Sequence, residues 1–140
     1  YVDVANGTKN YALYSPNAAV RAAAVYGDTI NVVNITGSTY KLDMSKGNII
    51  MIRANRKYTV NLPNANAVAS MFGYNSLPTY FAIHVRIMIH PDTSGVTISG
   101  YFRPNNTVNQ SVYLHPGNSI GFLVTNYPSF RWVETDYAGQ

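Results

Sequence analysis

Twelve residues in the middle of the chain, Thr79–His90, alternate between two kinds of side chain. One set is wholly apolar and comprises Phe81, Ile83, Val85, Ile87 and Ile89. The positions between them hold Tyr80, Ala82, His84, Arg86, Met88 and His90. Because the side chains of a β-strand point alternately to its two faces, this period of two predicts a strand with one apolar face. At about 3.3 Å per residue the strand would run about 40 Å, well beyond the usual length.

The second face of this predicted strand carries histidine, arginine and tyrosine but no acidic residue. Such a face favours packing or binding over catalysis. We therefore predict a candidate subunit interface formed by Tyr80, His84, Arg86, Met88 and His90, with Arg131 from a later strand. The alternative is the solvent-facing side of a sandwich. A guanidinium inside a strand needs a partner, either across the sheet or across a subunit boundary. Since acids are scarce, a small bound anion at such a boundary is a third choice.

Short strand-like runs separated by turn residues fill most of the chain. Gly, Asn and Pro at these breaks permit or preset the backbone angles of turns. The predicted strands are Tyr11–Tyr14, Thr29–Ile35, Thr39–Asp43, Asn48–Arg53, Lys57–Leu62, Thr79–His90, Val96–Phe102, Thr107–Leu114, Ser119–Thr125 and Phe130–Glu134. This spacing predicts an all-β sandwich or barrel. The uneven strand lengths favour a two-sheet jelly roll, whose wedge shape suits a closed homotrimer.

Two segments depart from the strand pattern. Asn17–Val25 is rich in alanine and suits either a helical turn or a closely packed strand. Asn64–Phe72 begins with a good N-cap residue and is followed by Gly73, which suits a short helix as well as a loop. We therefore expect at most one or two short helices.

The length of 140 residues suits a single domain, 1–140, with a core of its own. The chain has no cysteine, so neither a disulfide nor a thiolate is available. No apolar run approaches the roughly 20 residues that span a bilayer. Because the first residue is Tyr1 and not Met, we expect the C-terminal part of a longer chain.

Only 11% of the residues are charged, against about 25% in an average soluble domain. Sixteen asparagines and twelve tyrosines supply much of the polarity instead. The net charge of +4 mildly favours anionic partners, but the basic residues do not cluster strongly, so we predict no nucleic-acid binding. A charge-poor surface rich in Asn, Ser and Tyr favours an extracellular or virion protein.

The sequence gives little support to catalysis. Gly117–Gly121 matches the G-x-S-x-G pattern, but a nucleophile elbow needs a strand before the serine and a helix after it. Here a Pro-Gly turn precedes and an apolar strand follows. His84 and His90 are about 20 Å apart on an extended strand, too far to share a metal. Carboxylates are too sparse along the chain for glycoside hydrolysis, which usually requires two acids that flank one bond. We predict no enzyme, no cofactor and no metal.

Two kinds of loop are candidate binding sites. Arg53, Arg56 and Lys57 would lie together at a hairpin tip, where they could hold phosphate or carboxylate groups. A solvated turn that discourages edge pairing is the simpler interpretation, and the more favoured one. Tyr74, Asn75 and Tyr127 combine aromatic faces with planar amides, which suits sugars. Ordinary packing of tyrosines at strand ends is the alternative.

The stretch Leu114–Glu134, LHPGNSIGFLVTNYPSFRWVE, resembles the final strands of trimeric phage tail-tip domains. It shares with them a Pro-Gly turn, an apolar strand, a second turn and an aromatic strand with Arg131-Trp132-Val133. The chain as a whole is similar in composition to the knob of a podovirus tail needle or fibre head. No diagnostic motif accompanies the resemblance, so no residue roles carry over.

This resemblance implies a tumour-necrosis-factor-like (TNF-like) jelly roll that forms a homotrimer at the tip of a virion tail. Such a knob would be extracellular and would contact a host cell-surface component, a glycan or lipopolysaccharide, during attachment and genome delivery. The other functions that the sequence leaves open are a carbohydrate-binding module or adhesin and, ranked last, a hydrolase of envelope polymers.

Overall fold

A computed structural model describes residues 28–37 and 39–139. The predicted strand Tyr11–Tyr14 and the alanine-rich segment Asn17–Val25 lie outside them. The described residues form strands with one short helix. In chain order the elements are β1 (Ile30–Ile35), β2 (Ile49–Ala54), β3 (Tyr58–Asn61), α1 (Ala65–Met71), β4 (Ala82–Ile89), β5 (Val96–Tyr101), β6 (Gln110–Leu114), β7 (Ser119–Thr125) and β8 (Arg131–Ala138).

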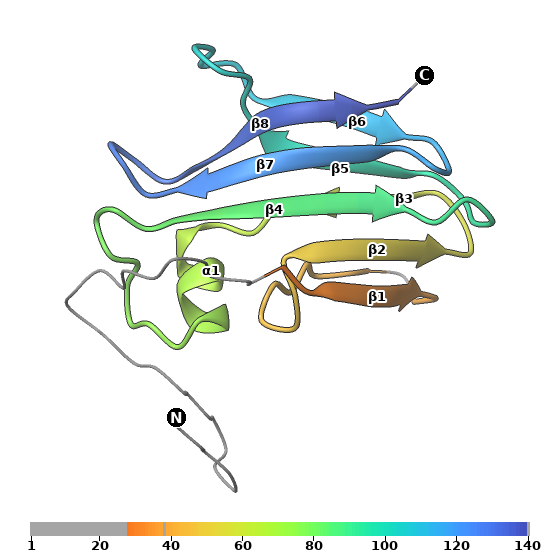
Figure 1. The fold of residues 1–140 in the computed structure, drawn as a ribbon, viewed down its shortest axis with the longest axis horizontal. Helices are drawn as coiled ribbons and strands as arrows, with labels where there is room; N and C mark the ends of the chain where they lie inside the picture. Colours follow the sequence, from red (N-terminus) through yellow and green to blue (C-terminus); the bar gives the residue numbers. More distant parts are fainter. Residues whose placement is uncertain (1–27, 38, 140) are drawn as a thin grey trace, which may run out of the picture.

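The strands form two sheets, which confirms the predicted all-β sandwich. One sheet has five strands in the order β1-β2-β4-β7-β8, and the other has three in the order β3-β5-β6. Figure 1 shows the five-stranded sheet in front and the three-stranded sheet behind it. Where β5 ends, Phe102 crosses over to bridge with Val133, so the chain links the two sheets at the edge of β8.

The hydrophobic core lies between the sheets, and the period-two patterns of the sequence explain it. On β4, Val85, Ile87 and Ile89 are buried, and on β7 the same is true of Ile120 and Phe122. The three-stranded sheet contributes fully buried side chains as well, namely Val60, Val96, Ile98 and Leu114. Burial of a side chain of this size contributes about 1.5–3 kcal/mol each.

Three aromatic residues organise the end of the core nearest the link between the sheets. The ring of Phe122 meets Tyr101 at a centroid distance of 5.3 Å and Trp132 at 5.5 Å, both edge-on. Trp132 Nε1 donates a hydrogen bond of 2.9 Å to the carbonyl of Pro63. This bond ties β8 to the loop that leads into the helix.

Helix α1 forms in the segment for which the sequence left a short helix and a loop equally open. Asn64 is its N-cap, with a side-chain oxygen that accepts a 2.9 Å hydrogen bond from the backbone nitrogen of Ala67. Gly73 follows the helix with a φ of +77°, a conformation that glycine adopts without strain. Val68 is completely buried against the core. In Figure 1 the helix lies below β4, beside the starting ends of β1 and β2.

The pairing of the strands differs from what local turn signals predict. The pairs β1–β2, β2–β4 and β3–β5 are parallel, whereas β4–β7, β5–β6 and β7–β8 are antiparallel. A jelly roll is an antiparallel architecture, so this finer part of the predicted fold is not confirmed. The hairpin predicted around Arg53–Lys57 is wrong, because β2 and β3 belong to different sheets.

The predicted and observed strands differ at several places, and two of these differences concern the core. Thr79–His90 forms a strand only over β4, because Pro78 and Pro91 flank a loop at one end and a turn at the other. Thr39–Asp43 is not a strand, although Leu42 and nearby Met44 are buried in the core. Apolar side chains can therefore fill the core from a segment without regular pairing.

Candidate functional site on the outer face of the five-stranded sheet

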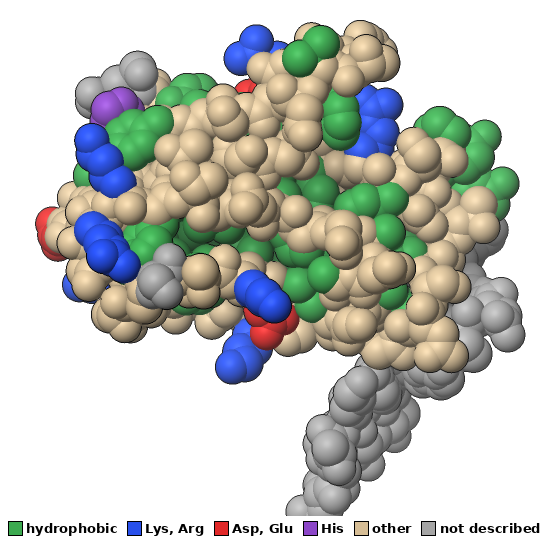
Figure 2. Space-filling model, turned by 180° about the vertical axis from the view of Figure 1, so that it is seen from behind, with side chains coloured by type: hydrophobic (Ala, Val, Ile, Leu, Met, Phe, Trp, Pro, Cys, Tyr) green, Lys and Arg blue, Asp and Glu red, His purple; other side chains and the backbone are tan. Residues whose placement is uncertain are grey.

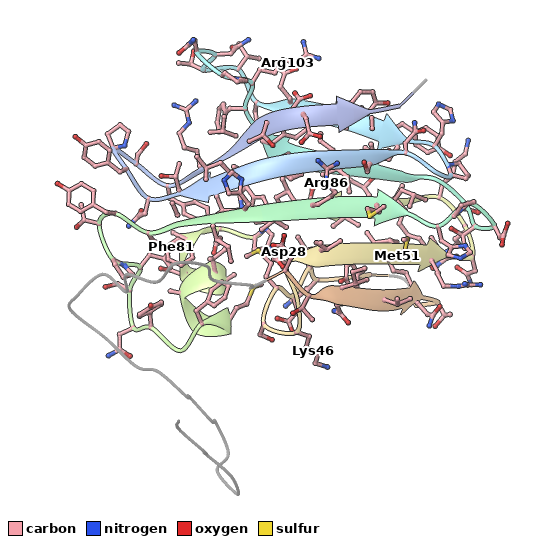
Figure 3. The ribbon with its side chains drawn as sticks, in the orientation of Figure 1. Asp28, Lys46, Met51, Phe81, Arg86 and Arg103 are labelled. Atoms are coloured by element: carbon pink, nitrogen blue, oxygen red, sulfur yellow. The ribbon has the colours of Figure 1, made fainter. Side chains whose placement is uncertain are left out.

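The outer face of the five-stranded sheet is the side that points away from the core. On β4 it carries His84, Arg86 and Met88, as the alternation predicted, while the residues between them point inward. The register places Ile49 of β2 on one side of Arg86 and Gly121 of β7 on the other. Figure 3 shows Met51 and Arg86 on the side of the sheet that faces the viewer.

Half of this outer face is apolar. Ile30 and Val32 of β1 are 61% and 55% exposed, and β1 is the edge strand of the sheet. Ile30 pairs with Ile49, Val32 pairs with Met51, and Met51 pairs with Met88. We call the set Ile30, Val32, Ile49, Met51 and Met88 the apolar stripe. Apolar side chains that lie together on an exposed sheet face are typical of an interaction surface.

The other half of the outer face is polar and contains an ion pair that spans β4, β7 and β8. Arg86 of β4 donates a hydrogen bond to Asp136 of β8, over the intervening strand β7. Gly121 lies directly beneath the pair. A Cβ atom there would overlap Asp136 Oδ1 and would lie 2.9 Å from Thr135 Oγ1. The absence of a side chain at residue 121 therefore lets the two charged groups lie flat on the sheet.

A β-bulge places the carboxylate where the guanidinium can reach it. Between Gly121 and Phe122 the register with β8 shifts, so that Phe122 pairs with Glu134 while Gly121 pairs with Asp136. Thr135 is the extra residue, and its hydroxyl donates a 3.1 Å hydrogen bond to Asp136. Bulges often re-aim a side chain in this way.

The ion pair changes the pKa of its acidic member. The hydrogen bond from Arg86 lowers the pKa of Asp136, against a smaller opposing effect of partial burial. Arg86 also donates a 2.9 Å hydrogen bond from Nη1 to the hydroxyl of Ser119. Ser119 is the serine of the G-x-S-x-G pattern, and it begins strand β7 and precedes no helix. The hydrogen-bond partner of Ser119 is thus Arg86. The strand β7 that Ser119 begins is the apolar strand predicted from the sequence.

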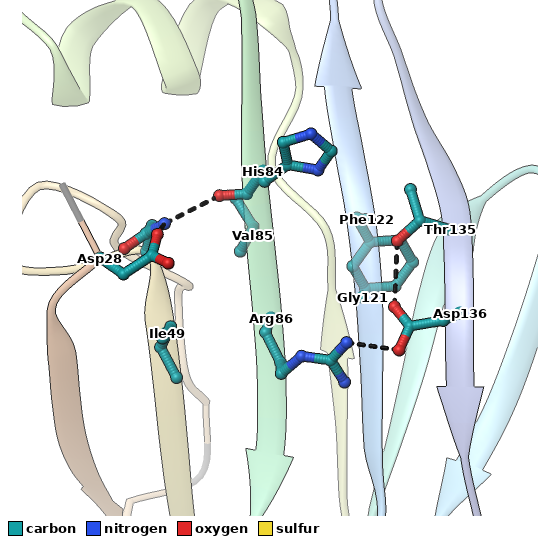
Figure 4. A pocket seen from close by; sticks show the side chains of 10 residues that line it. Asp28, Ile49, His84, Val85, Arg86, Gly121, Phe122, Thr135 and Asp136 are labelled. Carbon is teal, nitrogen blue, oxygen red and sulfur yellow. Dashed lines mark hydrogen bonds and ion pairs between the residues drawn. The ribbon is translucent and has the colours of Figure 1, made fainter. Parts of the chain in front are cut away.

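A shallow hollow of about 180 Å³ lies beside the ion pair, between β2 and β8 (Figure 4). Asn48 closes one side of it. The side-chain amide of Asn48 donates to Asp28 at 2.7 Å and to the carbonyl of His84 at 3.1 Å, and its oxygen accepts from the backbone of Thr29. These bonds fasten the start of β1 to β4, which keeps the apolar stripe in register with the polar half of the face.

The structure separates the three cations predicted to share one loop. Arg53 lies on the outer face, with Nη1 at 3.1 Å from His90 Nε2. Arg56 stacks over the ring of Tyr58 and donates to the carbonyl of Gly37, whereas Lys57 lies over the ring of Tyr113. Figure 2 shows the opposite side of the molecule, where Lys and Arg side chains are distributed over the surface and some lie beside an acidic side chain.

The residues predicted for the subunit interface do not all share one face. Tyr80 lies in the loop before β4, and His90 lies just after that strand. Arg131 begins β8, where its guanidinium stacks on Phe102 and donates a 3.2 Å hydrogen bond to the carbonyl of Asn106. Arg131 Nε is buried and has no hydrogen-bond partner among the described residues. His84, Arg86 and Met88 share the outer face, and the ring of His90 reaches it as well, since its Nε2 lies 3.1 Å from Arg53 Nη1.

The predicted aromatic and amide residues lie in two loops at one end of the sandwich. Tyr74 and Asn75 follow α1, and Tyr127 lies between β7 and β8. Tyr74 packs edge-on against Phe81 at 6.4 Å. Tyr127 has a partner that the sequence did not suggest, because its ring lies 5.1 Å from that of Tyr80. Both rings of this pair are exposed.

Other kinds of site find no support in the part of the chain that the structure describes. Residues 28–37 and 39–139 contain no group of three His, Asp or Glu side chains arranged to hold a metal ion. No helix among them has the length and apolar character needed to cross a membrane. Comparison with family models, with curated proteins and with solved structures finds no match.

Sequence reasoning missed Asp136 as the partner of Arg86. The two residues are fifty positions apart, and the bulge that brings Asp136 into place has no clear local signature. The one available signal was Gly121 within an apolar strand, since a glycine there often marks a bulge or a close approach. The sequence predicted that β1 is a strand. It did not predict that β1 lies at the sheet edge, because that position depends on the parallel pairing of β1 with β2.

Proposed function

We propose that this domain is the distal tip, or knob, of a virion tail needle or fibre that contacts the host envelope during attachment and genome delivery. In this proposal the domain acts by binding, without catalysis, and three copies associate into a TNF-like trimeric head. The observation that carries the proposal is the apolar stripe, in which Ile30 and Val32 are exposed on the edge strand of the five-stranded sheet.

The chemistry of the outer face favours other copies of the chain as its occupant. The apolar stripe offers area whose removal from water contributes about 25 cal/mol per Å², from which the entropic cost of association is subtracted. The neighbouring polar half already satisfies its charges internally, through the pair of Arg86 with Asp136. A copy that covers this polar half therefore meets Arg86 and Asp136 as a paired charge. The resemblance of Leu114–Glu134 to trimeric tail-tip domains favours three copies. The small anion at a subunit boundary stays a prediction.

The oligomeric state tests this proposal. We expect sedimentation equilibrium and light scattering to give three times the 15.4 kDa of the chain. Val32→Glu places a charge in the apolar stripe and should convert the trimer to monomers. Val108→Glu is the matched control, because Val108 is similarly exposed but lies in the loop before β6. A wild-type chain that remains monomeric at its highest soluble concentration would contradict the proposal.

A carbohydrate-binding module that acts as a monomer is the second candidate. The exposed ring pair of Tyr80 and Tyr127 favours it, since sugar rings stack on aromatic faces. Monomers that bind a glycan would support this candidate against the trimeric tip. A hydrolase of envelope polymers ranks third, and would require turnover of lipopolysaccharide that is lost when an Asp or Glu is substituted.

A further inference from the structure

Two tyrosines from distant parts of the sequence form an exposed pair at one end of the sandwich. Tyr80 is 79% exposed and Tyr127 is 58% exposed, although both are large aromatic residues. Their ring centroids are 5.1 Å apart, and the planes are tilted by 41°. Aromatic residues normally bury most of their area, so two adjacent rings left in water form an unusual surface.

A clamp between the two loops holds this pair in place. Asn126, next to Tyr127, donates from its side-chain amide to the carbonyls of Leu77 at 3.2 Å and Pro78 at 3.0 Å. The backbone nitrogen of Asn126 donates to the carbonyl of Phe81 at 3.0 Å. These three bonds connect the β7–β8 loop to both sides of Tyr80. The backbone that carries the two rings is therefore preorganised, which lowers the entropic cost of binding a ligand.

The two loops carry no charge. Residues 72–81 and 125–130 contain no Lys, Arg, His, Asp or Glu. They instead provide hydroxyl and amide groups, including exposed Asn75, Ser76 and Thr79. An ionic ligand such as a phosphate or a charged peptide would find no counter-ion here. A neutral ligand with an apolar face and hydroxyl edges fits both the rings and their surroundings.

We propose that Tyr80 and Tyr127 form a binding platform for neutral pyranose sugars, and that Asn126 is the positioning residue that holds it. One sugar ring stacks on the exposed aromatic faces, while its hydroxyls reach the amides and hydroxyls of the two loops. The platform does not require the trimer, because both loops belong to one chain. It gives the proposed envelope-contacting tip a ligand class, uncharged glycan, but it also stands if the domain is a monomer.

The test begins with an array that carries neutral and acidic bacterial polysaccharides and oligosaccharides. We expect wild-type protein to bind neutral members, and isothermal titration with the best of these to give its affinity. Tyr80→Ala and Tyr127→Ala should each lower that affinity at least about tenfold, the equivalent of about 1.4 kcal/mol. Tyr137→Ala is the control, because Tyr137 is also exposed but lies near the far end of β8.

Conservative variants separate stacking from other effects. Tyr80→Phe and Tyr127→Phe keep the rings and should retain most of the affinity, whereas Asn126→Ala should weaken binding without removing either ring. Circular dichroism establishes that each variant is folded. If an alanine variant fails to fold, the binding site is instead located on the wild-type chain, from the changes in amide chemical shift on addition of the saccharide. The saccharide is then expected to perturb Thr125–Phe130 and Thr79–Ala82.

Three results would overturn the platform. They are the absence of binding to any neutral saccharide, equal loss of binding in Tyr137→Ala, and shift changes confined to another part of the domain. Light scattering on the same samples keeps the two proposals apart. Trimers that bind no neutral sugar would remove the platform and leave the tip, whereas monomers that bind sugar would do the reverse.

Discussion

The ion pair of Arg86 with Asp136 gives the sharpest test of the outer face, because it depends on β4, β7, β8 and the bulge together. The two side chains are 33% and 52% exposed, so solvent screens the pair considerably. Exposed pairs contribute about 0.2–1 kcal/mol, and the second bond from Arg86 to Ser119 fixes the guanidinium. We therefore expect a coupling of about 0.5–1 kcal/mol, in the upper half of that range.

A double-mutant cycle measures this coupling. Arg86→Met keeps the apolar stem of the side chain, and Asp136→Asn keeps the shape of the acid. Urea unfolding of the four proteins is followed by the fluorescence of Trp132, the single and fully buried tryptophan. All four are compared at one protein concentration, because association adds to apparent stability. High salt should reduce the coupling.

The pH dependence has a definite sign. Arg86 lowers the pKa of Asp136 in the folded chain, so folding favours the ionised carboxylate. The stabilisation is complete above the unfolded pKa, about 3.9, and is lost as the pH falls through the lower folded pKa. The coupling should be present at neutral pH and close to zero at about pH 2. A coupling that is absent at neutral pH, or equal at both, would refute the reasoning.

Two further changes probe the same architecture. Gly121→Ala should destabilise the wild type more than it destabilises an Asp136→Ala variant, because the new Cβ meets Thr135 Oγ1 in both backgrounds but overlaps the carboxylate of Asp136 only in the wild type. Equal effects in both backgrounds, measured by urea unfolding, would contradict the placement of the pair over β7. Trp132→Phe removes the hydrogen bond to Pro63 and leaves a cavity beside Phe122. Thermal melts followed by circular dichroism should therefore show that the free energy of unfolding falls by about 2–4 kcal/mol. A fall below about 1 kcal/mol would contradict the described packing of Trp132.

Local patterns in the sequence predict the strands and the core well. The alternation around β4 separates buried Val85 and Ile87 from outward Arg86, and the structure confirms that division. Strand β7 has the predicted bounds, and α1 begins after the predicted N-cap Asn64. These features depend on neighbours a few residues apart, which is the range that periodicity and capping describe.

Contacts between distant residues could not be predicted in the same way. Nothing in the turn residues indicates that β2 pairs in parallel with β1 and β4, so the exposed edge with Val32 was not foreseen. The three cations of Arg53–Lys57 separate because β2 and β3 diverge into different sheets. The pairing of Tyr80 with Tyr127 likewise follows from the meeting of two loops, which depends on the complete topology.

The covering of the outer face by sister copies can be measured directly with thiol labelling. The chain has no cysteine, so Val32→Cys introduces a single reactive group in the apolar stripe, and Val108→Cys supplies a similarly exposed control. We expect the thiol at residue 32 to react at least about tenfold more slowly than the control at high protein concentration. That protection should disappear on dilution. Equal labelling rates at every concentration would show that no second copy covers the stripe.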